Sequence, residues 1–396
     1  MPFLDIAICN ELRDTVNSSP IFTEIEEYSK HFNQICAVID RVQTSVNYLN
    51  KHNDYPKSEE ELICFMVFSC MIVDASKYLF KDILNDIAPN RKRSEFFKEI
   101  CKNKPFSLSD EECLTDDEFF EYIRSLIFAH PYETSRNKTL RQKFGKQVSP
   151  WVFLDCRLLK NNSDNCIGIR MYTSKKDEYD MDSHSIYIPF SLLKYYISSR
   201  YSDLKLVIVW MEQQIQLHED KWKKHKIDRT KNKEEILNQI ITVLQERFIE
   251  TYGVEEIKSL LFCDISLDEN KHYINQFRKN IESKLVSLYD SVDNMDYDSF
   301  FAIISEMLCC YPKNLHESGH YQLEKIFSYL KSEYEDSIYE GSNAEWGLIQ
   351  AEAFYKQFAY KWVKIDVRKM SFAEIRLLVS VACFMQIQEE KLIGSD

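Results

Sequence analysis

Apolar residues recur alternately three and four positions apart between about Pro20 and His52, and this spacing constrains the fold more than any other feature. The positions are Ile25, Tyr28, Phe32, Ile35, Ile39, Val42, Val46 and Leu49. Because such steps keep side chains on one face of an α-helix, they predict a long helix with a seam for a partner. The apolar stretch from Leu62 to Phe80 predicts a second, central helix. We therefore expect a helical bundle that begins with this antiparallel pair.

Composition supports a helical, soluble protein. The 396 residues include only seven glycines and nine prolines, so turn signals are few. A formal net charge of −13 argues against a protein coated in nucleic acid but allows local basic patches. The twelve cysteines form no CxxC pair, which is typical of reduced, buried thiols in a cytosolic protein. No secretory signal is present, and the apolar run from Leu62 to Val73 is too short to span a bilayer. We expect a cytoplasmic location and no membrane contact.

Three segments in the middle of the chain read as strands. Residues 151–156, 166–172 and 185–189 are rich in β-branched and aromatic residues and are bounded by polar clusters, which predicts a small antiparallel meander. Helical spacing returns from Phe190 and continues beyond Glu235 to the end. We expect a mainly α fold: a helical domain over residues 1–222 with a β insertion near 150–189, and an all-α C-terminal domain over 234–396.

The boundary between these domains falls in a basic segment. Lys221 to Lys233 carries seven lysines and arginines against one acid, Asp228. Such a run either contacts phosphates or is a solvated loop between helices.

One helix carries the residues of greatest chemical interest. Thr115 and Glu118 have the spacing of a capping box, and Phe119, Ile123 and Leu126 follow at helical intervals. Arg124 lies inside this apolar run, where an unpaired guanidinium would be costly. His130 directly precedes Pro131, which disfavours helical geometry at the residue before it.

Arg124 and His130 would not meet on one continuous helix. They would lie about 9 Å apart along the axis and about 120° apart around it. If the chain breaks at Pro131, the two side chains can converge, with Glu133, Ser135 and Arg136 at the same corner. Alternatively, Arg124 pairs with Glu121 or Glu133 at the edge of the core, and His130 only complements the helix dipole.

The segment Arg124-Ser125-Leu126-Ile127-Phe128-Ala129-His130 resembles the R-x(4–6)-H motif of HEPN domains. Ser125 occupies a position that is often Asn, Asp or His in that family. HEPN domains are all-α modules, and many are metal-independent endoribonucleases. The resemblance implies that no metal or other cofactor is needed, and that a homodimer forms a composite active site. It also implies a role in a bacterial toxin or anti-phage system, with an antitoxin or other regulatory partner.

The resemblance also assigns roles to residues. His130 would be the general acid/base for attack of a ribose 2′-hydroxyl on the adjacent phosphate, and Arg124 would stabilise charge on the phosphoryl oxygens. Ser125, Glu133 and Arg136 would support the pair or grip RNA. The basic stretch from Arg136 to Gln147 contains no acid, and its side chains would contact RNA phosphates: Lys138, Arg141, Lys143 and Lys146.

Two other functions remain open. A HEPN-like bundle can be a non-catalytic interaction or RNA-binding protein, in which Arg124 and His130 pack against their own subunit. A zinc metalloprotease is the other alternative, because His316-Glu317-Ser318-Gly319-His320 matches the HExxH pattern. Pro312, Asn314, Ser318 and Gly319 surround that motif with residues typical of a loop or a helix start.

Overall fold

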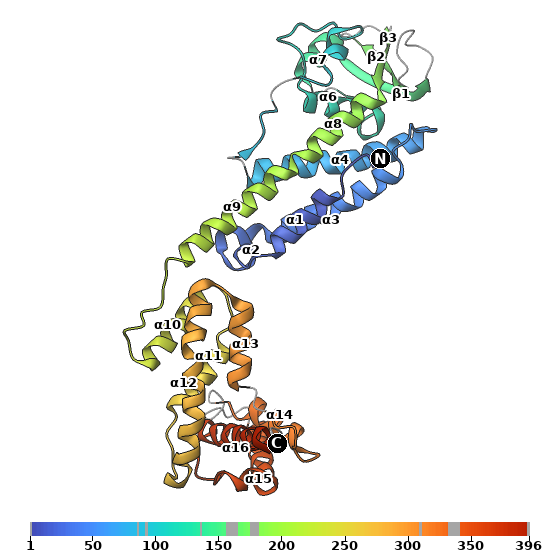
Figure 1. The fold of residues 1–396 in the computed structure, drawn as a ribbon. Helices are drawn as coiled ribbons and strands as arrows, with labels where there is room; N and C mark the ends of the chain where they lie inside the picture. Colours follow the sequence, from blue (N-terminus) through green and yellow to red (C-terminus); the bar gives the residue numbers. More distant parts are fainter. Residues whose placement is uncertain are drawn as a thin grey trace. The chain divides into compact units, whose positions relative to one another are not determined.

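The chain is mainly α-helical with one small antiparallel sheet, which confirms the predicted fold class. The structure is a computed structural model that describes residues 2–84, 87–91, 94–134, 137–155, 165–174, 182–308, 311–331 and 341–393. The chain divides into two compact units, Met1–His218 and Glu219–Asp396 (Figure 1).

The N-terminal unit is built on the predicted helix pair. Its helices are α1 (Ala7–Asn17), α2 (Ile21–Glu24), α3 (Glu26–Lys51), α4 (Glu59–Tyr78), α8 (Phe190–Ser202) and α9 (Leu204–Trp222), and α4 continues into the π-helical turn η1 (Leu79–Ile83). α4 packs against α3 and α8. The seam residues from Ile35 to Leu49 are buried, whereas Tyr28 and Phe32 are only half-buried. The single helix expected from Pro20 is interrupted at Ile25, whose backbone is extended.

α4 is the central helix of this unit. By length and composition alone, Glu59–Lys81 could cross a membrane, because its most apolar 18-residue window has a mean hydropathy of 1.7. The apolar run from Leu62 to Val73 is part of this longer helix. Much of Glu59–Lys81 is buried inside the protein, 56% of its most apolar window. Packing against both α3 and α8 explains an apolar surface that is wider than one stripe.

Short helical elements lie between η1 and the sheet. They are α5 (Lys98–Lys102), α6 (Asp116–Arg124), the π-helical turn η3 (Ser125–Ala129) and α7 (Lys138–Phe144). The predicted capping box is present, because the Thr115 hydroxyl accepts from the Glu118 amide at 3.2 Å and the Glu118 carboxylate accepts from the Thr115 amide at 2.9 Å. Asp116 is buried, and its carboxylate accepts the backbone N–H groups of Glu95, Phe96 and Phe97 at 2.9–3.0 Å.

The β insertion is a three-stranded antiparallel meander of order β1-β2-β3. The strands are β1 (Lys146–Asp155), β2 (Cys166–Ser174) and β3 (Asp182–Pro189), so β1 begins before the expected residue 151. The pairing of β1 with β2 shifts register between Val148 and Trp151. Gly168 pairs with Phe153, whose ring would lie 2.3 Å from any Cβ at that position. A larger residue at this position would displace the Phe153 ring.

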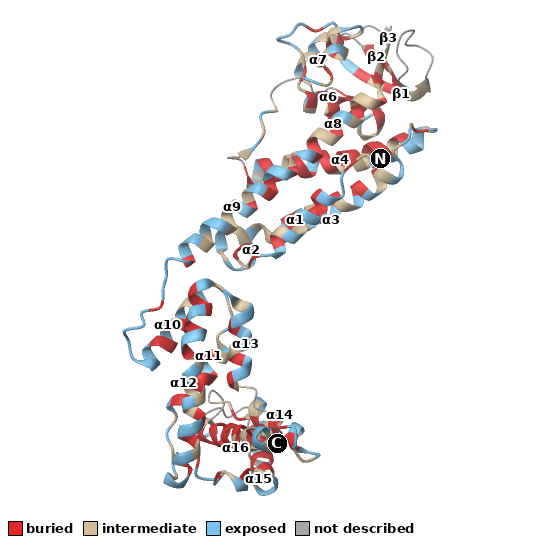
Figure 2. Cartoon of the chain, in the orientation of Figure 1, coloured by how far each residue is buried: buried red, intermediate tan, exposed pale blue. Residues whose placement is uncertain are grey.

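The C-terminal unit is all helical within its described residues. Its helices are α10 (Lys233–Glu246), α11 (Tyr252–Phe262), η4 (Asp268–Asn270), α12 (Lys271–Asn294), α13 (Tyr297–Leu308), α14 (Gly319–Tyr329), α15 (Gly341–Gln357), η6 (Ala359–Lys361) and α16 (Phe372–Ile393). Buried residues occupy most of the first half of α16 (Figure 2), which is the central helix of this core.

The basic segment from Lys221 to Lys233 folds back onto acidic residues of its own unit. His225 lies 2.9 Å from Glu246, and the Arg229 guanidinium lies 2.7 Å from Asp290 and 2.9 Å from Asp293. Lys233 pairs with Glu282 at 2.7 Å. These pairs neutralise much of the positive charge, which favours the reading as an inter-helix loop.

Replacing Asp116 with alanine should destabilise the N-terminal unit strongly. Three backbone N–H groups would lose their acceptor, and the buried one, at Phe97, alone costs about 1–3 kcal/mol if unsatisfied, so we expect a loss of about 2 kcal/mol or more. Urea unfolding of the full chain measures this loss. Asp14→Ala, at an exposed position of α1, is the matched control. Equal midpoints for the two variants would contradict the anchoring role.

Candidate functional site

Arg124 and His130 line the same cavity. The cavity has a volume of about 300 Å³. Its walls come from α4, from α6 and η3, and from the chain that leads into α7, and they comprise Lys77, Asp117, Glu118, Glu121, Tyr122, Arg124, Ser125, His130, Thr134 and Asn137. Both ends of the sequence motif, six residues apart, therefore lie in the lining of one cavity.

A change of helix type separates the two ends of the motif. The chain turns from α-helix to π-helix at Ser125, and the His130 amide donates to the Ser125 carbonyl at 2.8 Å, five residues back. The Thr134 hydroxyl then donates to the His130 carbonyl at 2.8 Å and holds the following loop. The helix ends at Ala129, so His130 lies where the chain leaves the helical path before Pro131.

Arg124 is held by two carboxylates of its own subunit. Its guanidinium lies 3.3 Å from Asp74 on α4 and 3.4 Å from Glu121, one turn back on α6. Glu121 also accepts from Lys77 at 2.8 Å. Burial alone lowers the pKa of Arg124, but Glu121, Cys70 and Asp74 more than offset this effect and raise that pKa. The guanidinium therefore stays charged and faces an acidic neighbourhood.

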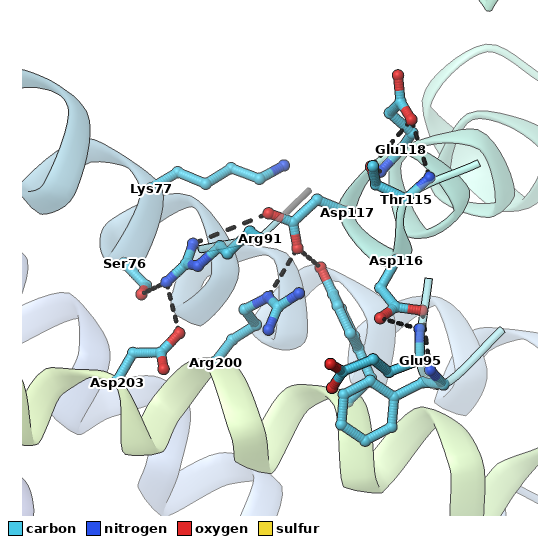
Figure 3. Close-up of polar contacts among 12 residues, drawn as sticks. Ser76, Lys77, Arg91, Glu95, Thr115, Asp116, Asp117, Glu118, Arg200 and Asp203 are labelled. Atoms are coloured by element: carbon cyan, nitrogen blue, oxygen red, sulfur yellow. Dashed lines mark hydrogen bonds and ion pairs between the residues drawn. The ribbon is translucent and has the colours of Figure 1, made fainter. Parts of the chain in front are cut away.

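A largely buried ion cluster lies in the wall of the cavity, around Asp117 (Figure 3). One oxygen of its carboxylate accepts from the Arg200 Nε at 2.7 Å and from the Tyr196 hydroxyl at 2.8 Å. The other oxygen lies 3.8 Å from Arg91. Arg91 in turn donates to Asp203 at 2.6 Å. The cluster joins the start of α6 to α8 and to the segment that contains Arg91.

The pKa of Asp117 reflects this environment. Burial by itself raises the pKa of the carboxyl, but the charge and hydrogen bonds of Arg200, the hydrogen bond of Tyr196 and the charge of Lys77 together bring it below the ordinary value. Asp117 is therefore an anion at neutral pH.

His130 is exposed, whereas Ser125 is buried and its hydroxyl donates to the Tyr122 carbonyl at 2.7 Å. Glu133 is exposed on the outer side of the loop, where it pairs with Lys146 at 3.4 Å, and it does not line the cavity. Ser135 and Arg136 lie outside the described residues. The expected corner of polar groups is thus made by Thr134 and Asn137 instead of Glu133.

The predicted RNA-binding residues lie on and just after α7. Lys138 and Arg141 are exposed and have no ion-pair partner among the described residues. Lys143 donates to the Ser107 carbonyl at 3.0 Å. Lys146 begins β1. Asn137 caps α7 by accepting from the Leu140 amide at 3.0 Å.

Sequence reasoning missed Lys77 and Asp117 as parts of the site. Lys77 is 44 residues from Glu121, its partner in the cavity wall, and Asp117 is 83 residues from Arg200. The local sequence offers one signal for Asp117, the acidic residues in the first turn of α6. Such residues are also expected at any helix start, so they do not single out Asp117.

The HExxH segment does not form a helical metal site. His316 precedes α14, which begins at Gly319, so His316 and His320 do not share a helix face. The His316 Nε2 lies 2.8 Å from the Gln322 side-chain oxygen, and the ring packs near Phe354 and Phe358. Among the described residues, no group of three histidine, cysteine or acidic side chains is placed to hold a metal ion.

Asp117→Asn should lower the free energy of unfolding at neutral pH. It should also make that free energy less dependent on pH in the acid range. Removing the charge leaves Arg200 poorly compensated, and breaking a buried pair costs about 3 kcal/mol. A carboxyl with a lowered pKa stabilises the fold fully above its unfolded value of about 4, and this contribution is lost as pH falls through the folded value. Urea unfolding from pH 3 to 7 should therefore show the gap between wild type and variant closing on acidification. Asp14→Asn is the exposed control, and a pH-independent gap would contradict the assignment.

Comparison with protein-family models, with curated proteins and with solved structures gives no match.

Proposed function

We propose that this chain is a metal-independent endoribonuclease of the HEPN type, with its active site in the cavity that Arg124 and His130 line. The observation that carries the proposal is their convergence on one cavity of about 300 Å³. This cavity is large enough for part of a nucleotide, and ligand sites of this size are common in proteins. The exposed His130 is open to a substrate in solution.

His130 would take the proton from the ribose 2′-hydroxyl. The resulting oxygen attacks the adjacent phosphorus, the bond to the 5′-oxygen breaks, and the leaving oxygen receives a proton. The products are a 2′,3′-cyclic phosphate and a 5′-hydroxyl end. Histidine suits both proton transfers near neutral pH. Arg124 would exchange a carboxylate partner for a phosphoryl oxygen and stabilise its developing charge.

A second subunit would complete the site. One histidine cannot act at the same moment as the base for the 2′-hydroxyl and as the acid for the leaving oxygen. A homodimer that brings two His130 side chains to one RNA strand would supply both groups. We propose such a dimer, acting in the cytoplasm in a toxin or phage-defence system under a regulatory partner.

A non-catalytic scaffold is the second candidate. The observation that favours it is the pairing of Arg124 with both Asp74 and Glu121 of its own subunit. In that case the motif only fastens α6 to α4.

His130→Ala and Arg124→Ala should each abolish most RNA cleavage measured in EDTA. General acid–base catalysis contributes about 10²–10⁴-fold, and loss of one charge-stabilising donor costs about 10²–10³-fold. Gel analysis of single-stranded RNA, with identification of the 3′ ends, measures both effects. His272→Ala and Arg41→Ala, at exposed positions outside the cavity, are the matched controls.

Two results would reject the nuclease. One is an inert wild-type protein on varied RNAs, together with lower stability of Arg124→Ala, which would favour the scaffold. The other is cleavage that EDTA removes, which would indicate a metal-dependent reaction.

Lys138→Gln and Arg141→Gln should weaken RNA binding uniformly across sequences. Each phosphate contact releases counterions, so loss of one contact should reduce the slope of log K against log salt by about 0.7 for single strands. Fluorescence anisotropy between 50 and 300 mM salt, in the His130→Ala background, measures this slope. Lys231→Gln, on the loop of the C-terminal unit, is the control. An unchanged slope in both α7 variants would remove this helix from the RNA site.

A further inference from the structure

A second cavity lies on the other side of the π-turn. Its volume is about 520 Å³, and most of its lining is apolar. η3, the loop after His130 and strand β1 form its walls. Two aromatic residues on its rim are unusually open to solvent: Tyr132 is 90% exposed and Trp151 is 48% exposed. Large exposed aromatic side chains at a cavity often mark a binding site.

Backbone contacts fix this cavity next to His130. The Ser149 amide donates to the Pro131 carbonyl at 2.8 Å, and the Thr134 amide donates to the Gln147 carbonyl at 2.8 Å. These bonds fasten the loop with Tyr132 to the strand with Trp151. Tyr132 is two residues from His130, so their Cα atoms lie within about 7.6 Å.

The cavity also offers polar recognition. Ser149 lines it and is buried, and its hydroxyl has no hydrogen-bond partner among the described residues. A buried hydroxyl without a partner is unfavourable, and a ligand with a hydrogen-bonding edge would satisfy it.

A cation stands beside the aromatic rim. Arg170 is the cross-strand partner of Trp151, and it donates to the hydroxyls of Ser183 and Ser185. Arg170 has no carboxylate partner among the described residues. Glu59 is the one acidic residue among those that line the cavity. The cation therefore complements a negatively charged ligand at the rim.

We propose that this cavity, which we name the base site, binds one nucleobase of single-stranded RNA beside the scissile bond. The base stacks on Tyr132 and Trp151, its edge hydrogen-bonds with the Ser149 hydroxyl, and Arg170 contacts a neighbouring phosphate. A flat ring with a polar edge and an attached phosphate matches all of these groups. Stacking on exposed aromatic rings is a common way to hold single strands. The inference rests on RNA being the substrate of the proposed nuclease.

Binding of two RNA probes tests the base site. Fluorescence anisotropy with the His130→Ala protein, which does not cut, compares a mixed-sequence 12-mer with an abasic ribose-phosphate 12-mer. Tyr132→Ala should lose about tenfold in affinity for the intact RNA and nothing for the abasic one, because stacking contributes about 1–3 kcal/mol per base. Tyr132→Phe should retain the affinity. Arg170→Gln should weaken both probes equally. Tyr195→Ala, at a 65% exposed tyrosine of α8, is the matched control.

Ser149→Ala gives an independent readout. It should change the preference among homopolymer RNAs while leaving the abasic probe unaffected. Because it removes an unpaired buried hydroxyl, it should leave the melting temperature equal or higher.

Several outcomes would overturn the base site. One is unchanged affinity of Tyr132→Ala for the intact RNA, and another is an equal loss of affinity for the intact and the abasic RNA. A third is that Tyr132→Ala loses self-association but still binds RNA, which would make the cavity a protein interface. If His130→Ala abolishes RNA cleavage but Tyr132→Ala does not change it, the proposed nuclease is supported and the base site is rejected. If base-dependent binding needs Tyr132 but the protein never cuts RNA, the base site stands and the nuclease fails.

Discussion

The half-buried carboxylate of Asp117, held between Arg200, Tyr196 and Arg91, is the interaction on which the N-terminal unit most depends. A buried charge that loses its partner is costly, so these groups must stay together once folded. Asp116, beside it, fixes the segment before α5 through three backbone bonds. These contacts fix the position of the first turn of α6, and they therefore also fix the position of Arg124 at the end of the same helix.

The β insertion fixes the other end of the same helix. The buried Tyr122 hydroxyl donates to Gln147 of β1 and contacts Met171 of β2. The π-turn that follows leads directly to the loop that β1 holds through Ser149 and Gln147. Strand β1 thus forms one wall of the second cavity and also holds the loop that follows η3.

The sequence predicted features that depend on neighbours in the chain. The seam from Ile35 to Leu49 and the Thr115–Glu118 capping box follow from spacings of three and four, and the strands follow from local composition. The cavity could be anticipated only in part. Its Arg/His motif is local in the sequence. The π-turn, however, replaces the i to i−4 hydrogen bonds of an α-helix with i to i−5 bonds, and no strong sequence signal predicts this change. The Asp117–Arg200 pair joins residues that only the folded chain brings together.

Magnitudes decide whether the pairing of Arg124 blocks a substrate. Its side chain is 23% exposed, and its partners Asp74 and Glu121 are 53% and 40% exposed. Exposed pairs of this kind are worth about 0–1 kcal/mol each, whereas a bidentate, charge-assisted bond from arginine to phosphate is stronger. Glu121 also accepts a hydrogen bond from Lys77, so it is not paired with Arg124 alone. The two carboxylates therefore orient the guanidinium without locking it, and a phosphate can replace one of them at small cost.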